Sequence, residues 1–308
     1  MLVDVALPLI LAFIMFSLGL GLKGADFSRV LKFPKAFGVG LANQLLLLPV
    51  VGFALATVFK LPPELAVGLM ILACAPGGVT TNVLTRIAGG NIPLSISMTA
   101  VTSLVSILTV PLVVVWSVRH FMGEAANDVD IAKLGAIMFL LTAVPVLLGM
   151  LVTRSAPGFV AKAGTAISRV GIGLFALIVI AAVASNWGVV SANFPALGPA
   201  LILLNVILLG LGLLSAKLLG LGTRDATTIS IESGVQNGTL GITVGKIVAG
   251  AAATTAAAAT GASEVLPTLT VPSAVYSLVM YAVTVPFVLW RMRKSANAST
   301  SRPEESLS

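Results

Sequence analysis

The sequence predicts an all-α polytopic membrane protein with nine transmembrane helices. Of its 308 residues, 57% are hydrophobic and 9% are charged, whereas a soluble domain carries about 25% charged residues. Apolar runs recur along the chain at lengths suited to a bilayer, which a helix of about 20 residues can span. Basic residues gather in every second loop between these runs. The composition therefore excludes an ordinary cytosolic domain.

Polar or charged residues separate the apolar runs and so set the bounds of each predicted helix. Asp4 stands where a signal peptide would carry basic residues, and no cleavage site follows, so we expect the first run to stay in the membrane as a helix. The nine predicted spans are 5–21, 36–58, 65–84, 94–117, 134–153, 170–190, 195–219, 227–248 and 266–290.

Lys and Arg alternate between the two sides of this arrangement. Fourteen of the 18 fall in one set of loops and in the C-terminal tail, whereas the other set holds Lys60, Arg119, Lys133 and Lys246. Because cytoplasmic loops are enriched in Lys and Arg, we expect the N-terminus outside and the C-terminus inside a bacterial inner (plasma) membrane. This distribution accounts for the net charge of +7 without a nucleic-acid partner.

Two predicted spans carry helix-breaking and polar residues at membrane depth. The third contains Ala-Pro-Gly-Gly-Val-Thr-Thr-Asn over 75–82, and the eighth contains Ile-Glu-Ser-Gly-Val-Gln-Asn-Gly over 231–238. Pro and Gly weaken a helix, and a charge such as that of Glu232 at a bilayer centre costs about 2.5–3.5 kcal/mol. Either segment alone could be a kink or a contact between helices. Together they favour a transporter binding site built from two broken helices.

The positions of the two breaks also predict an internal repeat. If the chain divides into four and five spans, and the first half lacks an opening helix, each interrupted helix is the fourth of its half. Repeats of five spans have opposite orientations in the membrane, which is a common architecture of secondary transporters. We expect one transmembrane domain over residues 1–294 and a cytoplasmic tail over 295–308.

The side chains around Glu232 in these motifs offer oxygen atoms. Zinc and copper prefer nitrogen or sulfur, and a single Cys74 and a single His120 cannot form a metal cage or an internal disulfide. An oxygen cage with one carboxylate suits Na⁺, and protonation of Glu232 is the alternative. The candidate oxygen donors are Gln44, Thr81, Asn82, Ser95, Thr99, Gln236 and Asn237.

These motifs resemble those of the bile acid:sodium symporter superfamily, and the resemblance extends from Val5 to Trp290. It rests on Pro76-Gly77-Gly78, Thr81-Asn82-Val83, Gly90-Asn91, Leu94-Ser95, Thr99 and Ile231-Glu232-Ser233-Gly234-Val235-Gln236-Asn237, together with the spacing from Gln44 to Thr81.

The resemblance implies two Na⁺ sites where the broken helices cross, and no other cofactor. One site would use Thr81, Asn82, Ser95, Thr99 and Glu232, and the other Gln44, Glu232 and Gln236 with the backbone of Ser233 and Val235. Asn237, Val79 and Thr80 would face the substrate. A panel (about 1–21 and 133–190) would move against a core (about 36–117 and 195–290).

Three features depart from the family pattern. The chain lacks the opening helix of ten-helix bacterial members and resembles the nine-helix animal type. Thr81 replaces the more usual Ser and retains the hydroxyl group. Val79 stands where several bacterial relatives have Thr, which removes a hydrogen-bonding group on the substrate side. The Ala- and Thr-rich segment 250–261 receives no function.

We therefore expect a Na⁺-coupled symporter of an organic anion, either bile acid-like or a small carboxylate such as pantoate. The alternative is a proton-coupled carrier or exporter of related fold. An enzyme is not expected, because Ser233 beside Glu232 lacks a histidine base and no catalytic metal motif occurs. The expected partners are Na⁺, the anion and the lipid bilayer. The sequence leaves the oligomeric state open, with a monomer as the simplest case.

Overall fold

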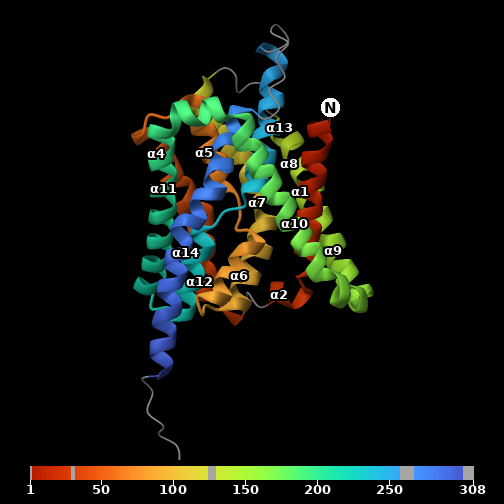
Figure 1. Ribbon diagram of the computed structural model, residues 1–308, viewed down its shortest axis with the longest axis vertical. Coiled ribbons are helices and arrows are strands. Elements are labelled where there is room, and N and C mark those ends of the chain that lie inside the picture. Colours follow the sequence, from red (N-terminus) through yellow and green to blue (C-terminus); the bar gives the residue numbers. More distant parts are fainter. Residues whose placement is uncertain (1, 29–31, 124–129, 257–266, 301–308) are drawn as a thin grey trace, which may run out of the picture.

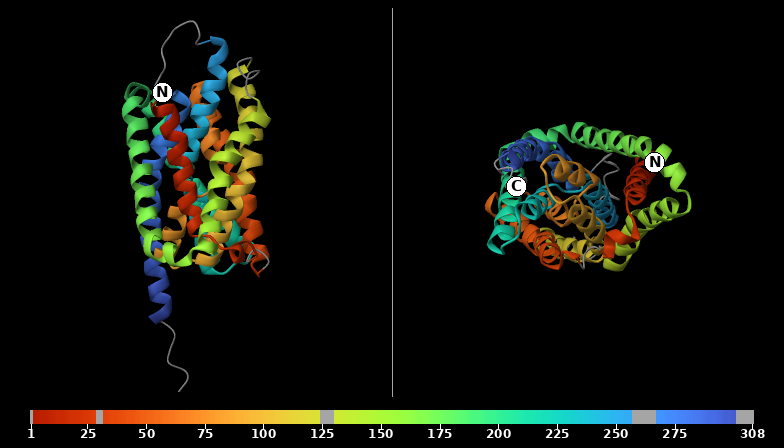
Figure 2. Two further views of the ribbon diagram at one scale, coloured as in Figure 1. Left: turned by 90° about the vertical axis from the view of Figure 1, so that its right-hand side faces the viewer. Right: turned by 90° about the horizontal axis from the view of Figure 1, so that it is seen from below.

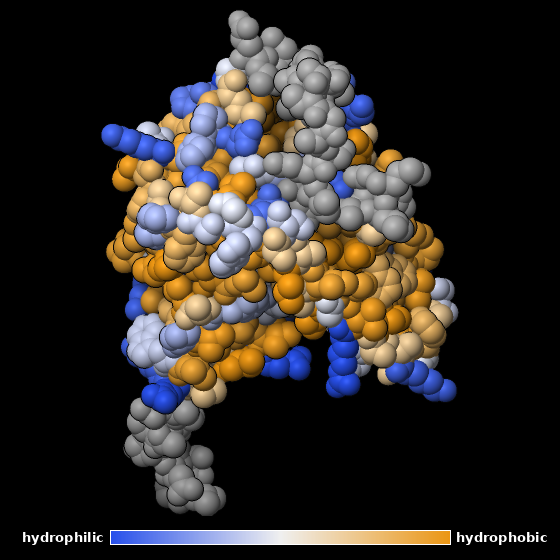
Figure 3. All heavy atoms as spheres, turned by 45° about the horizontal axis from the view of Figure 1, so that its top comes forward, coloured by the Kyte–Doolittle hydropathy of each residue, from blue (hydrophilic) through white to orange (hydrophobic). Residues whose placement is uncertain are grey.

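The computed structural model describes residues 2–28, 32–123, 130–256 and 267–300, and every regular element in these ranges is helical. On the face seen in Figure 3, an apolar belt lies between hydrophilic groups above and below it. The chain is a multi-pass α-helical membrane protein, as the sequence predicts. Among the residues that the structure describes, six helices are long and apolar enough to cross a membrane, namely Pro34–Val58, Ile92–Met122, Ile131–Ser155, Pro157–Ser185, Trp187–Leu218 and Thr268–Lys294.

Shorter and interrupted helices take the places of the other predicted spans. The third and eighth spans each form two helices, and the first forms α1. The predicted nine crossings and the inverted repeat therefore stay predictions. In chain order the elements are α1 (Leu2–Leu20), α2 (Gly24–Ser28), α3 (Pro34–Ala42), η2 (Asn43–Leu47), α4 (Leu48–Val58), α5 (Pro63–Cys74), α6 (Val79–Ile87), α7 (Ile92–Met122), α8 (Ile131–Met138), η4 (Phe139–Ala143), α9 (Val144–Ser155), α10 (Pro157–Ser185), α11 (Trp187–Leu218), α12 (Thr223–Gly234), α13 (Gly238–Ala256), η6 (Thr268–Thr270) and α14 (Val271–Thr300).

Proline explains a local widening of the helix that carries Gln44. Pro49 has no amide hydrogen to donate to the preceding turn, and the five residues Asn43–Leu47 form a π turn just before it. A π turn shifts the side chains around it and is frequent at functional sites. Gln44 lies within this turn and is buried, with 4% of its surface exposed.

The helices fall into two groups in space. Helices α1, α9 and α10 lie together at one end of the elongated cross-section (Figures 1 and 2), and α1 packs against both of the others. At the opposite end α11 packs against α12 and α14. The groups meet where α7 contacts α8 and where α10 contacts α14. This arrangement is compatible with a panel and a core, and the predicted boundaries of these two parts stay predictions.

Helices α1 and α9 approach closely because glycines face each other. A side chain at Gly19 would collide with the backbone carbonyl of Val146, and one at Gly149 would collide with the carbonyl of Phe16. Small residues at such contacts are typical of packing between membrane helices. On the other side, Leu72, Ile231 and Tyr276 belong to one buried apolar cluster that joins α5, α12 and α14. This cluster supports both interrupted helices.

Candidate functional site

The two breaks meet in the middle of the protein. Helix α5 ends at Cys74 and α6 begins at Val79, while α12 ends at Gly234 and α13 begins at Gly238. The backbone N–H of Asn237, in the second break, donates a 2.8 Å hydrogen bond to the carbonyl of Pro76, in the first. The two breaks are thus in direct contact at this point, which we call the crossing point.

Breaking a helix leaves backbone groups without their helical partners, and neighbouring side chains bind several of them here. The carbonyl of Ala75 accepts a 2.7 Å bond from Gln44 Nε2. The carbonyl of Gly234 accepts bonds of 2.6 Å from both Asn205 Nδ2 and the Tyr276 hydroxyl group. Because an unpaired buried carbonyl is costly, these side chains stabilise the unwound backbone.

Asn205 and Tyr276 were not among the sequence-predicted site residues. Asn205 is an amide in the seventh predicted span, and Thr284 donates a 3.2 Å bond to its Oδ1 atom. A search for polar residues in every predicted span, and not only in the broken ones, would have selected Asn205. Tyr276 gave no such signal, because tyrosine is common in membrane helices as an interfacial residue.

Glu232 lies in the last turns of α12 with 2% of its surface exposed. Its carboxylate accepts hydrogen bonds from Ser95 Oγ at 2.5 Å and from Thr99 Oγ1 at 3.1 and 3.2 Å. Ser95 and Thr99 are four residues apart and share one face of α7. Within the part of the chain that the structure describes, no charged group donates to this carboxylate.

The other two residues of the first predicted sodium group lie in the same cluster. Thr81 Oγ1 is 2.7 Å from the Gly78 carbonyl and 3.2 Å from Thr99 Oγ1. Asn82 Oδ1 is 2.8 Å from Ser95 Oγ. The hydroxyl groups of Thr81, Ser95 and Thr99 can donate only three hydrogen bonds in total. The acceptor oxygens around them, including both oxygens of the carboxylate, outnumber these donors. This donor set fits a hard monovalent cation better than it fits a closed hydrogen-bond network.

Part of the second predicted sodium group also comes together. Gln44 Nε2 lies 3.1 Å from Gln236 Oε1, and Gln236 Nε2 donates a 2.7 Å bond to the carbonyl of Ser233. The Ser233 hydroxyl donates instead to the Ile229 carbonyl at 2.8 Å, so its side chain is engaged within α12. Val235 follows in the break and is buried. A role for the Val235 carbonyl stays a prediction.

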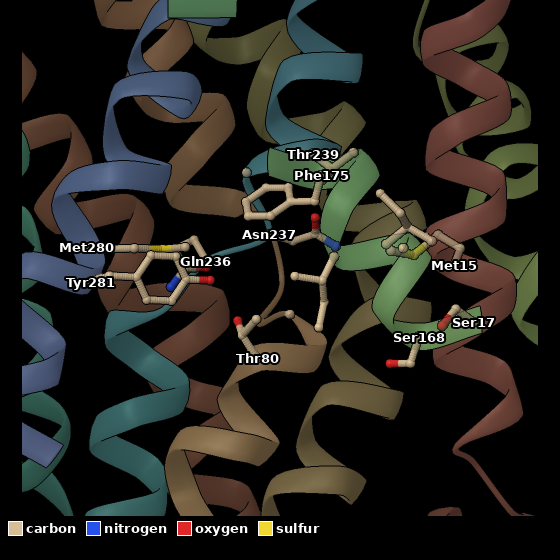
Figure 4. A pocket seen from close by; sticks show the side chains of 15 residues that line it. Met15, Ser17, Thr80, Ser168, Phe175, Gln236, Asn237, Thr239, Met280 and Tyr281 are labelled. Atoms are coloured by element: carbon tan, nitrogen blue, oxygen red, sulfur yellow. The ribbon is translucent and has the colours of Figure 1, made fainter. Parts of the chain in front are cut away.

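A third set of side chains lines a cavity beside the crossing point (Figure 4). Thr80 from α6 and Asn237 and Gln236 from the second break form one side. Of the predicted substrate-facing residues, Thr80 and Asn237 line this cavity, while Val79 begins α6 and its side chain lies outside the described residues. Lining residues that the sequence did not predict are Ile14, Met15, Ser17, Ser168, Gly171, Ile172, Phe175, Thr239, Met280 and Tyr281.

The cavity thus has an apolar side and a polar side. The apolar side chains come mainly from α1 and α10, such as Met15 and Phe175, and the amides of Gln236 and Asn237 lie at the break between the half-helices. The Tyr281 phenol on α14 hydrogen-bonds with Thr80. The N-termini of α6 and α13 both begin here, and a helix N-terminus carries partial positive charge. Such a lining suits an organic molecule with an apolar body and a polar or anionic group.

A polar clamp fixes α7 to α12 at the other end of the site. Asn91 Nδ2 donates a 2.8 Å bond to Asp225 Oδ1, and the Asn91 N–H donates a 2.8 Å bond to Thr228 Oγ1. Asn91 precedes α7, which carries Ser95, and Asp225 lies in the first turn of α12, which carries Glu232. The clamp therefore sets the register between the hydroxyl groups and the carboxylate.

Comparison with known proteins identifies the family of the chain. The chain is 31% identical over 272 residues to an uncharacterized sodium-dependent transporter of Bacillus subtilis, YocS, covering 88% of this chain and 78% of that protein. It is 35% identical over 235 residues to a probable chloroplastic sodium/metabolite cotransporter of Oryza sativa, BASS2, covering 75% of this chain and 54% of that protein. It is 29% identical over 235 residues to the ileal sodium/bile acid cotransporter of Homo sapiens, covering 75% of this chain and 66% of that protein. The profile of the Sodium Bile acid symporter family matches residues 8–193, and the chain belongs to this family.

Proposed function

We propose that the protein is a secondary active transporter that couples Na⁺ to the uptake of an organic anion by alternating access. The observation that carries this proposal is the buried carboxylate of Glu232, whose hydrogen-bond partners are the uncharged hydroxyls of Ser95 and Thr99. A carboxylate in a membrane interior needs a compensating charge. A bound Na⁺ supplies that charge and uses the surplus oxygen atoms of the cluster. The relatives described above are named as a sodium-dependent transporter, a probable sodium/metabolite cotransporter and a sodium/bile acid cotransporter.

Two ions fit the two side-chain groups. The first would bind among Thr81, Asn82, Ser95, Thr99 and Glu232, and the second among Gln44, Gln236, Glu232 and the carbonyls of Ser233 and Val235. Two Na⁺ ions with one monovalent anion carry one net positive charge inward, and each such charge gains about 2.3 kcal/mol per 100 mV. Uptake is then electrogenic.

The anion binds in the cavity beside the crossing point, where Thr80 and Asn237 offer hydrogen bonds. Cation binding orders the two breaks, and these breaks also hold Thr80 and Asn237. Occupation of the ion sites therefore fixes the positions of the side chains that bind the anion. During the cycle a panel that contains α1, α9 and α10 moves against the remaining helices. With the N-terminus outside, the ions and the anion move toward the cytoplasm across the inner membrane.

The competing possibility is that a proton neutralises Glu232. Na⁺ coupling and proton coupling would use the same arrangement of side chains around Glu232. They differ in whether Na⁺ or a proton neutralises the carboxylate. We would purify the protein in detergent and measure its thermal unfolding while Na⁺ replaces K⁺ at constant ionic strength. A ligand that binds only the folded state at 100 times its Kd adds about 2.7 kcal/mol of stability.

The variant Glu232→Gln keeps the size of the side chain and removes its charge. Its matched control is Glu64→Gln, because Glu64 lies exposed in the first turn of α5. We expect Na⁺-specific stabilisation in the original protein and in Glu64→Gln, and its loss in Glu232→Gln. If Na⁺ and K⁺ act alike and stability instead follows pH in a manner that depends on Glu232, the proton-coupled carrier replaces this proposal.

A further inference from the structure

A second cavity adjoins the one beside the crossing point. It lies between the end of α1, helix α6, the start of α7 and the first half of α10. Ser17 and Ser168 line both this cavity and the one beside the crossing point, and Figure 4 shows these two serines on the α1 and α10 side of the site. The two cavities are therefore neighbours at these serines.

Two arginines from different helices line the second cavity. Arg86 lies in the last turn of α6, and Arg169 lies in the first half of α10. Both side chains are exposed. The described residues that line this cavity include no Asp or Glu. Two cationic groups thus share one solvent-accessible space without a carboxylate among its described lining residues.

The common role of such arginines is to extend toward the membrane surface. An arginine in that role does not need a second arginine in the same cavity. Here the two come from helices of different groups, α6 beside the crossing point and α10 beside α1. A cleft lined by one sign of charge between low-dielectric walls focuses the electric field and concentrates ions of the opposite sign.

We infer that Arg86 and Arg169 form an anion-selective vestibule that receives the carboxylate, sulfonate or sulfate group of the transported solute on its path to or from the crossing point. This inference rests on the proposed function for the identity of the solute, and it adds the residues that select its charge. The guanidinium groups attract anions into the cavity and disfavour cations. The phosphate of a phosphatidylglycerol headgroup is also an anion that these arginines could bind. The test must therefore separate a transported solute from a lipid headgroup.

The cysteine content of the chain suits a thiol-labelling measurement of the charge selectivity of this cavity. Its single cysteine, Cys74, is buried, so Cys74→Ala with Ser168→Cys presents one thiol where the two cavities join. We would reconstitute this protein in phosphatidylcholine nanodiscs. The rates of thiol modification by an anionic sulfonatoethyl and a cationic trimethylammonium-ethyl methanethiosulfonate would then be compared. The ratio of the two rates reports the local potential and requires neither Na⁺ nor transport.

We expect Arg86→Gln and Arg169→Gln each to lower the anion-to-cation rate ratio about three- to fivefold at low ionic strength, with a smaller effect at high salt. Arg86→Lys and Arg169→Lys should keep the ratio. The matched control is Arg154→Gln, because Arg154 lies in the last turn of α9 and lines a different cavity. Equal effects of Arg154→Gln and the two test variants, or no effect of the test variants, would overturn the inference.

The second arm of the experiment identifies the source of the anion. Taurocholate, an amphipathic sulfonate, should slow labelling of Ser168→Cys in phosphatidylcholine, and the uncharged methyl ester of cholic acid should slow it less. The difference should shrink in the two Arg→Gln variants. If taurocholate has no effect while phosphatidylglycerol in the nanodisc slows the anionic reagent, the arginines hold a lipid and the inference is wrong. Loss of Na⁺-specific stabilisation would reject the proposed function and leave these labelling ratios interpretable.

Discussion

The N–H of Asn237 donates a 2.8 Å hydrogen bond to the carbonyl of Pro76, and this bond joins the two interrupted helices where both are unwound. The residues next to these two, Gly77 and Gln236, face the two predicted sodium groups. A change in one break therefore reaches the other directly. This explains why the chain concentrates its intramembrane polar residues in two short segments far apart in sequence.

Glycine at position 77 is required because the break passes directly against Glu232. A β-carbon at Gly77 would lie 2.6 Å from Glu232 Oε2. A β-carbon at Gly78 would lie 3.7 Å from its nearest neighbour, Thr80 Oγ1, which is an ordinary van der Waals contact. We expect Gly77→Ala to abolish Na⁺-specific thermal stabilisation and Gly78→Ala to retain it. Both variants add one methyl group to the same break, so helix propensity cannot explain a difference. Similar Na⁺ responses would contradict the placement of the ion beside Glu232.

Ser95 donates to Glu232 and should contribute directly to ion binding. Ser95→Ala removes an oxygen from the cluster, and hydrogen bonds to charged groups contribute about 1.5–3 kcal/mol, so we expect the Kd for Na⁺ to rise at least tenfold. Ser97 is the control, because it is equally buried on α7 and donates to the Pro93 carbonyl within its own helix. Isothermal titration with NaCl measures both variants. A normal Kd in Ser95→Ala would remove this residue from the ion site.

Tyr276 should matter for stability more than for ion chemistry. Its hydroxyl group donates to the Gly234 carbonyl at the end of α12, and Asn205 donates to the same atom. Tyr276→Phe leaves one of these two donors, so we expect a loss of about 1 kcal/mol in the free energy of unfolding with Na⁺ binding retained. Asn205→Leu in addition would leave the carbonyl unpaired and should cost more than the two single changes combined. Thermal unfolding with and without Na⁺ tests both statements.

The sequence predicts the breaks and the cluster of side chains around Glu232 because both depend on residues that are rare in membrane helices. Glu232 and the Pro-Gly-Gly segment are chemically conspicuous, and the spacing of Ser95 and Thr99 places them on one helix face. Asn205 was missed although an amide in a predicted membrane span is a signal. Tyr276 gave no signal, because the backbone carbonyl that both side chains bind leaves no mark in a sequence. Met15 and Phe175 were missed for a related reason. Apolar side chains that line a cavity look like those that face lipid.

The register between α7 and α12 gives a further test, because Asn91 and Asp225 can be exchanged. Asn91 Oδ1 accepts the Leu94 N–H and caps α7, while its Nδ2 donates to Asp225. Asn91→Asp keeps the cap, since Asp is as good an N-cap as Asn, but it places two carboxylates together and removes the donor. We expect a loss of about 1–2 kcal/mol in the free energy of unfolding and weaker Na⁺ binding, because Ser95 and Glu232 lose their alignment.

The double variant Asn91→Asp with Asp225→Asn restores one donor and one carboxylate in exchanged positions. It should recover most of both losses in thermal unfolding and Na⁺ titration, whereas additive losses would show that the two side chains act independently.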